Sequence, residues 1–76
     1  MKAYVASKSS TYRFALEAEN IIEVCATGPN PEFDAASYAK DYVKGTDLPA
    51  YVYEVDIKHL GGYKVQKEVV AFGAPE

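Results

Sequence analysis

The sequence contains no tryptophan, one cysteine and one histidine, and these shortages limit both its stabilisation and its chemistry. Cys25 has no second thiol with which to form a disulfide within the chain. A zinc site needs three or four cysteine, histidine or carboxylate ligands at recognisable spacings, and Cys25 and His59 belong to no such pattern. We therefore expect no disulfide, no metal ion and no other cofactor.

Long apolar runs and clusters of basic residues are also missing. No stretch approaches the roughly 18 apolar residues of a membrane span, and residues 1–4 lack the apolar run of a signal peptide. The 8 lysines and arginines are scattered, and 11 acidic residues outnumber them. Binding to a phosphate backbone requires clustered basic side chains. We expect a cytoplasmic protein that binds no membrane, and this charge pattern disfavours nucleic acid as a partner.

The length of 76 residues leaves room for one hydrophobic core, which predicts a single domain over residues 1–76. A hydrophobic content of 49% and a charged content of 25% are typical of a globular protein. So small a core gives little net stability, and without disulfides or a metal the remaining support is association with another chain. A homodimer formed through an exposed strand edge is one such arrangement.

The clearest predicted element is a helix over residues 31–44. Asn30 is suited to be its N-cap, Pro31 fits the first helical position, and Glu32 complements the positive end of the helix dipole. Gly45 supplies a left-handed C-terminal stop. The helix carries one apolar stripe of small and medium side chains: Ala35, Ala36, Ala39, Tyr42 and Val43.

Residues 50–59 alternate in hydropathy and predict a half-buried strand, with 63–72 returning as the second strand of a hairpin. We expect the face with Tyr51, Tyr53, Val55 and Ile57 to meet the helix. Placing Val65 and Val69 on that face requires a connection of three or five residues near Gly61, with a glycine in the left-handed conformation. Lys67 then requires either a bulge or a position at the sheet margin.

The amino-terminal part of the chain permits two interpretations. Residues 3–7, 12–17 and 21–26 read as three short strands, which β-favouring residue types support. The alternative is a helix over residues 14–25, where apolar side chains also fall on one helical face. We favour strands, and so predict an α+β fold: an antiparallel sheet of four to five short strands with one helix packed on one face.

No set of residues forms a recognisable catalytic site. Cys25 as a nucleophile would need His59 as its base, but no third residue orients the pair, so we interpret Cys25 as a buried structural thiol. Glu54 and Asp56 lie roughly 7 Å apart on one strand face, within the range of paired catalytic carboxylates. With Lys58 following, that face reads as a solvated, charge-balanced surface. We expect no catalytic residue and no enzyme.

Tyrosine is the most over-represented residue, with 7 copies against 3 phenylalanines. Its apolar ring and polar hydroxyl suit the anchors of protein interfaces. We therefore predict a protein partner, with six candidate contact residues: Tyr4, Tyr12, Tyr38, Tyr63, Glu54 and Asp56.

The order of elements, with Asn-Pro-Glu at 30–32, Lys-Gly at 44–45 and Tyr-Val-Tyr-Glu-Val at 51–55, resembles small phage-encoded accessory and inhibitor proteins. Examples are the host RNA polymerase inhibitor of T7-like phages and compact anti-CRISPR proteins. This resemblance of layout implies a non-enzymatic binder that blocks the surface of a host protein in the host cytoplasm. The alternative function is a small-ligand or nucleic-acid-binding domain.

Overall fold

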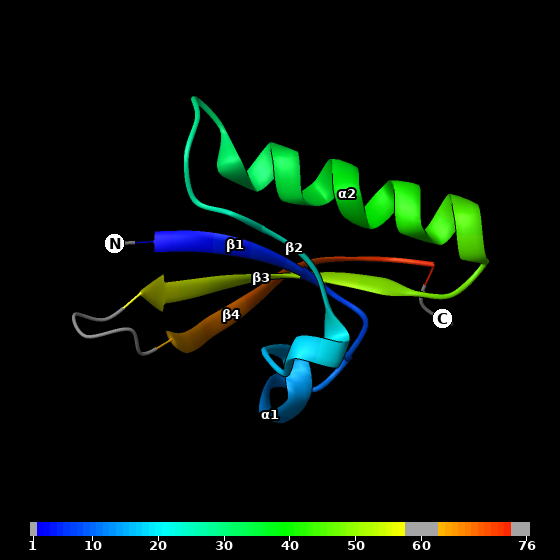
Figure 1. The fold of residues 1–76 in the computed structure, drawn as a ribbon, viewed down its shortest axis with the longest axis horizontal. Coiled ribbons are helices and arrows are strands. Elements are labelled where there is room, and N and C mark those ends of the chain that lie inside the picture. Colours follow the sequence, from blue (N-terminus) through cyan, green and yellow to red (C-terminus); the bar gives the residue numbers. More distant parts are fainter. Residues whose placement is uncertain (1, 58–62, 74–76) are drawn as a thin grey trace.

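The computed structural model describes residues 2–57 and 63–73 and shows a four-stranded antiparallel sheet with one long helix packed on it (Figure 1). The elements are β1 (Lys2–Ser7), α1 (Tyr12–Ala15), a 3₁₀ turn (Ala18–Asn20), β2 (Ile21–Cys25), α2 (Pro31–Thr46), β3 (Ala50–Ile57) and β4 (Tyr63–Phe72). The strand order is β2-β1-β3-β4, which places β2 and β4 at the edges. The predicted α+β fold is confirmed. No helix within the described ranges is long and apolar enough to cross a membrane.

Helix α2 begins as its sequence predicts and ends slightly later. The Asn30 side chain accepts a hydrogen bond from the Phe33 backbone N–H at 3.2 Å, which confirms the N-cap. The predicted stop at Gly45 is wrong, because the left-handed residue is Asp47, with φ 60°. Its N–H donates to the Val43 carbonyl at 2.8 Å, and a short polar side chain tolerates this conformation.

The alanine stripe of α2 packs on the sheet, but on the face opposite to the one predicted. Ala35 and Ala39 are fully buried and form a cluster with Ala6, Cys25, Ala50 and Val52. Tyr51 and Tyr53 point to the other face. Small side chains on both partners let the helix approach the sheet closely, and tyrosine rings between them would hold the layers apart.

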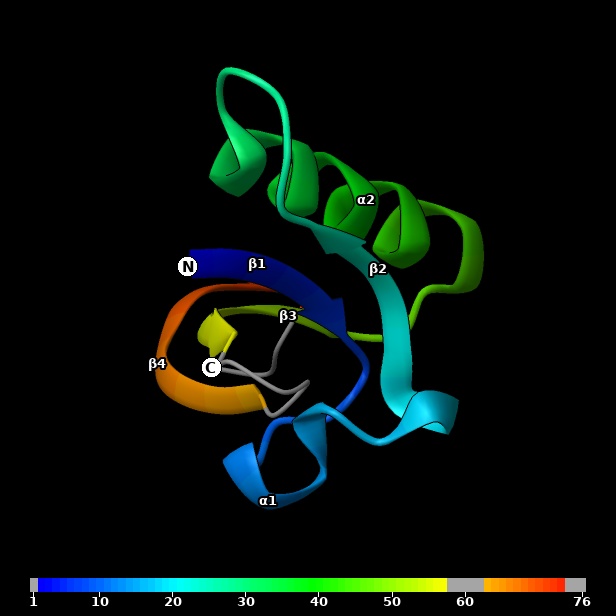
Figure 2. The same ribbon diagram turned by 60° about the vertical axis from the view of Figure 1, so that its left-hand side comes forward.

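The second face of the sheet is covered by the segment that contains α1, on the side opposite α2 (Figure 2). Ala15 and Leu16 pack there on a cluster of Ala3, Val5, Tyr51, Tyr53 and Val55. The strand predicted over residues 12–17 and the alternative helix over 14–25 are both wrong, whereas strands 3–7 and 21–26 are confirmed within a residue. The reason is a tertiary contact: the Ser7 hydroxyl, at the end of β1, donates to the Ala15 carbonyl at 2.9 Å and so holds this backbone against the sheet.

The β3–β4 hairpin has the longer of the two predicted connections. Ile57 pairs with Tyr63, which leaves residues 58–62 between the strands. The predicted left-handed glycine falls outside the described residues.

Strand β4 is bulged at two places, so of the two alternatives that Lys67 left open, a bulge or a position at the sheet margin, the structure shows the bulge. Val55 pairs with Val65, but Glu54 pairs with Lys67, and the register shifts again between Tyr53 and Val52. Each shift moves the following β4 side chains to the other face. Val65 therefore packs with the α1-side cluster and Val69 with the α2-side cluster, so the prediction that these valines share a face is wrong.

Candidate functional site

An open groove with a volume of about 620 Å³ lies between edge strand β2 and the first half of α2. Its polar lining comes from Glu23, Cys25, Thr27, Asp34, Ser37, Tyr38 and Asp41. Asp34 and Asp41 are two helical turns apart with Tyr38 between them, so all three lie along one side of α2.

This groove is negatively charged. Glu23 contributes a carboxylate from β2, and Asp34 and Asp41 contribute two more from α2. The described residues that line the groove include no lysine or arginine. Three carboxylates around one open hollow favour a cationic ligand over an anionic one.

Cys25 is in the wall of the groove and is only 8% exposed. Burial, followed by the charges of Asp34 and Glu23, raises the pKa of its thiol above the ordinary value. The thiol is therefore protonated at neutral pH, which makes it a weak nucleophile and a poor metal ligand. His59, the base considered above, falls outside the described residues. Within the described part of the chain, no group of three or more histidine, cysteine or carboxylate side chains is arranged to hold a metal.

The outer edge of β2 carries backbone groups that have no strand partner within residues 2–57 and 63–73, where β2 pairs with β1 alone. The Val24 N–H instead donates to the Glu23 carboxylate at 3.0 Å. An N–H that took part in the β1–β2 pairing would point toward β1. The bond to Glu23 therefore shows that the Val24 N–H points to the open edge of the sheet. The Glu23 side chain thus covers an edge donor that another strand would otherwise meet.

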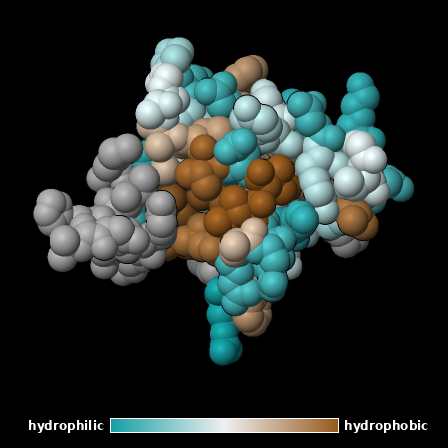
Figure 3. All heavy atoms as spheres, viewed as in Figure 1, coloured by the Kyte–Doolittle hydropathy of each residue, from teal (hydrophilic) through white to brown (hydrophobic). Residues whose placement is uncertain are grey.

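The other side of β2 is apolar. Ile21 and Val24 lie beside Val5 and Leu16 around a small hollow of about 100 Å³, and Val24 is 39% exposed. In Figure 3, apolar side chains form a patch on the face toward the viewer, between α2 and the α1 segment. Strand β2 therefore has an acidic surface on its helix side and an apolar surface on its α1 side.

Of the predicted tyrosine contacts whose side chains the structure describes, Tyr38 lies in this groove and Tyr4 does not. Tyr38 is 47% exposed and forms part of its wall. Tyr4 is half-buried against the α2-side cluster, opposite Cys25 in the β1–β2 pair. The side chains of Tyr12 and Tyr63 fall outside what the structure describes. A role of these residues in partner binding stays a prediction.

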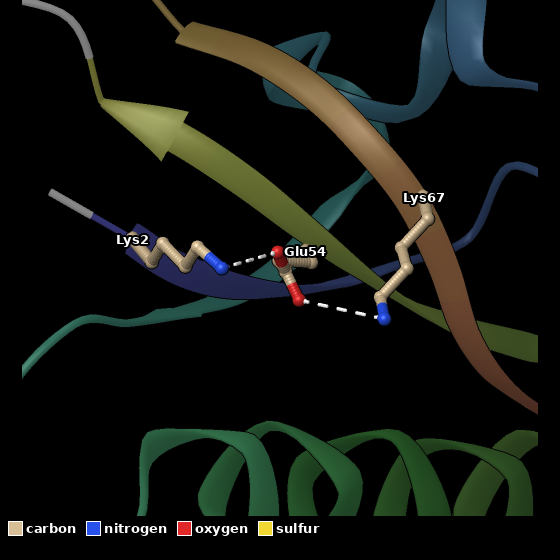
Figure 4. A network of polar contacts seen from close by, with 3 residues as sticks. All are labelled: Lys2, Glu54 and Lys67. Carbon is tan, nitrogen blue, oxygen red and sulfur yellow. Dashed lines mark ion pairs between the residues drawn. The ribbon is translucent and has the colours of Figure 1, made fainter.

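The predicted acidic contacts lie away from the groove. Glu54 is on the face covered by α2, and its side chain is only 12% exposed, so the expectation of a solvated surface is wrong for this residue. Figure 4 shows its carboxylate between the lysines of two neighbouring strands, 3.2 Å from Lys2 and 3.9 Å from Lys67. The hydrogen bond to Glu54 raises the pKa of Lys2. Asp56, one pleat further along β3, is partly exposed.

Sequence reasoning missed Glu23, Asp34 and Asp41 as a group. The spacing of Asp34, Tyr38 and Asp41 along one helix side was visible in the sequence. What the sequence did not show was that β2 turns back along the sheet edge and brings Glu23 beside that helix side.

Comparisons of this chain with protein-family models, with curated proteins and with solved structures find no match. A functional assignment therefore depends on the geometry of the β2 edge and the groove beside it.

Proposed function

We propose that the protein is a non-enzymatic protein-binding module that binds its partner along the edge of β2 and the adjoining groove. The observation that carries this proposal is the Val24 backbone N–H, which points to the open edge of β2 and donates to the neighbouring Glu23 carboxylate. Open strand edges commonly bind extended segments of other proteins, because the partner completes the backbone hydrogen bonds.

The chemistry of the groove supports binding. Its carboxylates lie in an open hollow, and the Cys25 thiol is buried and has a raised pKa. The exposed ring of Tyr38 on the groove wall offers the combination of apolar surface and hydroxyl that protein interfaces use.

A small-ligand or nucleic-acid-binding function is less well supported. The groove volume of about 620 Å³ is within the range of ligand sites, but such sites are mostly enclosed and apolar, whereas this groove is open and acidic. The carboxylates would repel a phosphate backbone.

Site-specific photo-crosslinking tests the proposal. A photoreactive phenylalanine analogue replaces Tyr38 in one variant and Leu48 in a second, and each is irradiated in bacterial lysate, the setting that the phage-like layout suggests. Leu48 is 54% exposed but lies beyond the far end of α2, so it is a matched control. We expect a discrete crosslinked protein at position 38 and none at position 48. The same adducts at both positions, or none at either, would contradict a protein-binding role for this surface.

A further inference from the structure

A strand added to β2 would meet two different surfaces at once. Successive side chains of a strand point to opposite faces of the sheet. Every second side chain of the added strand would therefore lie over the acidic groove formed with α2. The intervening ones would lie on the α1 side, against the apolar hollow that contains Ile21 and Val24.

We propose that the β2 edge binds an extended segment of another protein in which lysine or arginine alternates with aliphatic residues. This inference rests on the protein-binding function proposed above and specifies the chemistry of the partner. The basic side chains pair with Glu23, Asp34 and Asp41, and the aliphatic side chains cover the exposed part of Val24. Because the side chains of the partner strand alternate between the two faces of the sheet, its basic residues lie on the acidic side and its aliphatic residues on the apolar side.

Glu23 has a different role before and after binding. In the free protein its carboxylate accepts the Val24 N–H at 3.0 Å. In the complex a backbone carbonyl of the incoming strand accepts that N–H instead, and the Glu23 carboxylate, which already lines the groove, becomes free to pair with a basic side chain. The exchange keeps the edge donor satisfied in both states and protects the edge from segments that bring no compensating positive charge.

A second copy of this chain fits the same edge poorly. Glu23 is the middle residue of β2, so an antiparallel pair of β2 strands centred on it sets two carboxylates against each other. The net charge of −3 adds to that repulsion. The pairing of the other edge strand, β4, shifts register twice, whereas the pairing of β2 with β1 shifts once.

Fluorescence anisotropy with labelled synthetic peptides tests the inference on the intact chain. The probe is a peptide of about seven residues that alternates lysine and valine; the controls are a peptide of the same composition with its lysines and valines in two blocks, and an alternating glutamate–valine peptide. We expect the alternating basic peptide to bind at least about tenfold more tightly than either control, a difference of about 1.4 kcal/mol.

Two double variants distinguish the effect of the groove carboxylates on peptide affinity from the effect of net charge. Asp34→Asn with Asp41→Asn removes two groove carboxylates, and Glu17→Gln with Asp47→Asn removes the same charge from exposed positions outside it. We expect about a tenfold loss of affinity for the first pair and less than about a twofold change for the second. Equal losses for both pairs, or equal binding of the alternating and block peptides, would overturn the inference.

The Val24 amide reports the edge directly. In a ¹⁵N–¹H spectrum of the wild-type protein, the alternating peptide should shift the Val24 amide and slow its hydrogen exchange. Val24→Pro removes this donor at an edge position that tolerates proline, and circular dichroism checks that the variant folds. An unmoved Val24 amide, or full binding by folded Val24→Pro, would refute pairing at β2. If these tests fail while crosslinking at Tyr38 succeeds, the protein-binding function stands and only the partner chemistry is wrong.

Discussion

The hydroxyl group of Tyr53 donates a hydrogen bond to the backbone carbonyl of Ser9 at 2.6 Å, which joins a central strand to a loop 44 residues away in sequence. Tyr53 is fully buried on the α1 side of the sheet. This bond, with the one from Ser7 to Ala15, fixes the segment that covers that face.

Tyr53→Phe should therefore destabilise the protein although the ring remains in place. Loss of the hydroxyl leaves the Ser9 carbonyl without this donor, which should cost about 1–2 kcal/mol and lower Tm by about 5–10 °C. Thermal unfolding followed by circular dichroism measures the change. Tyr38→Phe, in which an exposed tyrosine loses its hydroxyl, is the control and should leave Tm unchanged. Equal shifts in the two variants would show that the Tyr53 hydrogen bond does not stabilise the fold.

Two glycines should respond in opposite directions to alanine. Gly73 has φ +69°, and a Cβ there would lie 2.9 Å from Val43 Cγ1, so Gly73→Ala should cost about 1–2 kcal/mol. Gly45 lies in α2 with nothing within 4 Å of the added Cβ, and Gly45→Ala should stabilise by about 0.5–1 kcal/mol. Urea denaturation of both variants gives the two free energies. A change of the same sign in both would contradict the assigned backbone conformations.

Helix α2 was predictable from sequence because its signals are local. Its cap involves Asn30 and Phe33, three residues apart, and its stripe follows from helical spacing. The face on which it packs was not predictable from strand alternation alone. Both faces of β3 are buried. The helix, lined by Ala35 and Ala39, packs on the face whose side chains are small, and strand alternation does not identify that face.

The segment over residues 12–20 and the acidic groove were harder to predict for one shared reason. Each depends on residues that are distant in sequence, such as Tyr53 for the loop at Ser9 and Glu23 beside Asp34. Local patterning gave two competing interpretations of the segment, and the structure matches neither because side chains from the sheet hold its backbone.

Because of the ion pair between Lys2 and Glu54, the free energy of unfolding should decrease as the pH rises in the alkaline range. The hydrogen bond to Glu54 raises the pKa of Lys2 above 10.5 in the folded state. The stabilisation is therefore fully present below pH 10.5 and is lost as pH rises through the folded-state pKa. Urea unfolding between about pH 8 and pH 12 should show a difference between wild type and Lys2→Gln that shrinks at the top of this range.

A double-mutant cycle isolates this pair. In a Glu54→Gln background, Lys2→Gln should have little further effect on stability, and the pH dependence of the difference should disappear. An unchanged pH dependence in that background would assign the effect to another group.

The Cys25 thiol should react slowly with a thiol-specific disulfide reagent at pH 8. Burial and the nearby Asp34 and Glu23 charges raise its pKa, which lowers the fraction of reactive thiolate. Asp34→Asn should lower that pKa and increase the rate severalfold, whereas Asp47→Asn, beyond the other end of α2, should not. The reaction is followed by the absorbance of the released thiolate, and identical rates in both variants would contradict the electrostatic cause.

The two bulges of β4 have a consequence for how the molecule unfolds. One continuous strand supplies Val65 to the cluster under the α1 segment and Val69 to the cluster under the long helix. Neither cluster can come apart without releasing a strand that the other also needs. A chain of this size thus gains the cooperativity of a single unit from two small hydrophobic centres, and its denaturation should proceed in one all-or-none step.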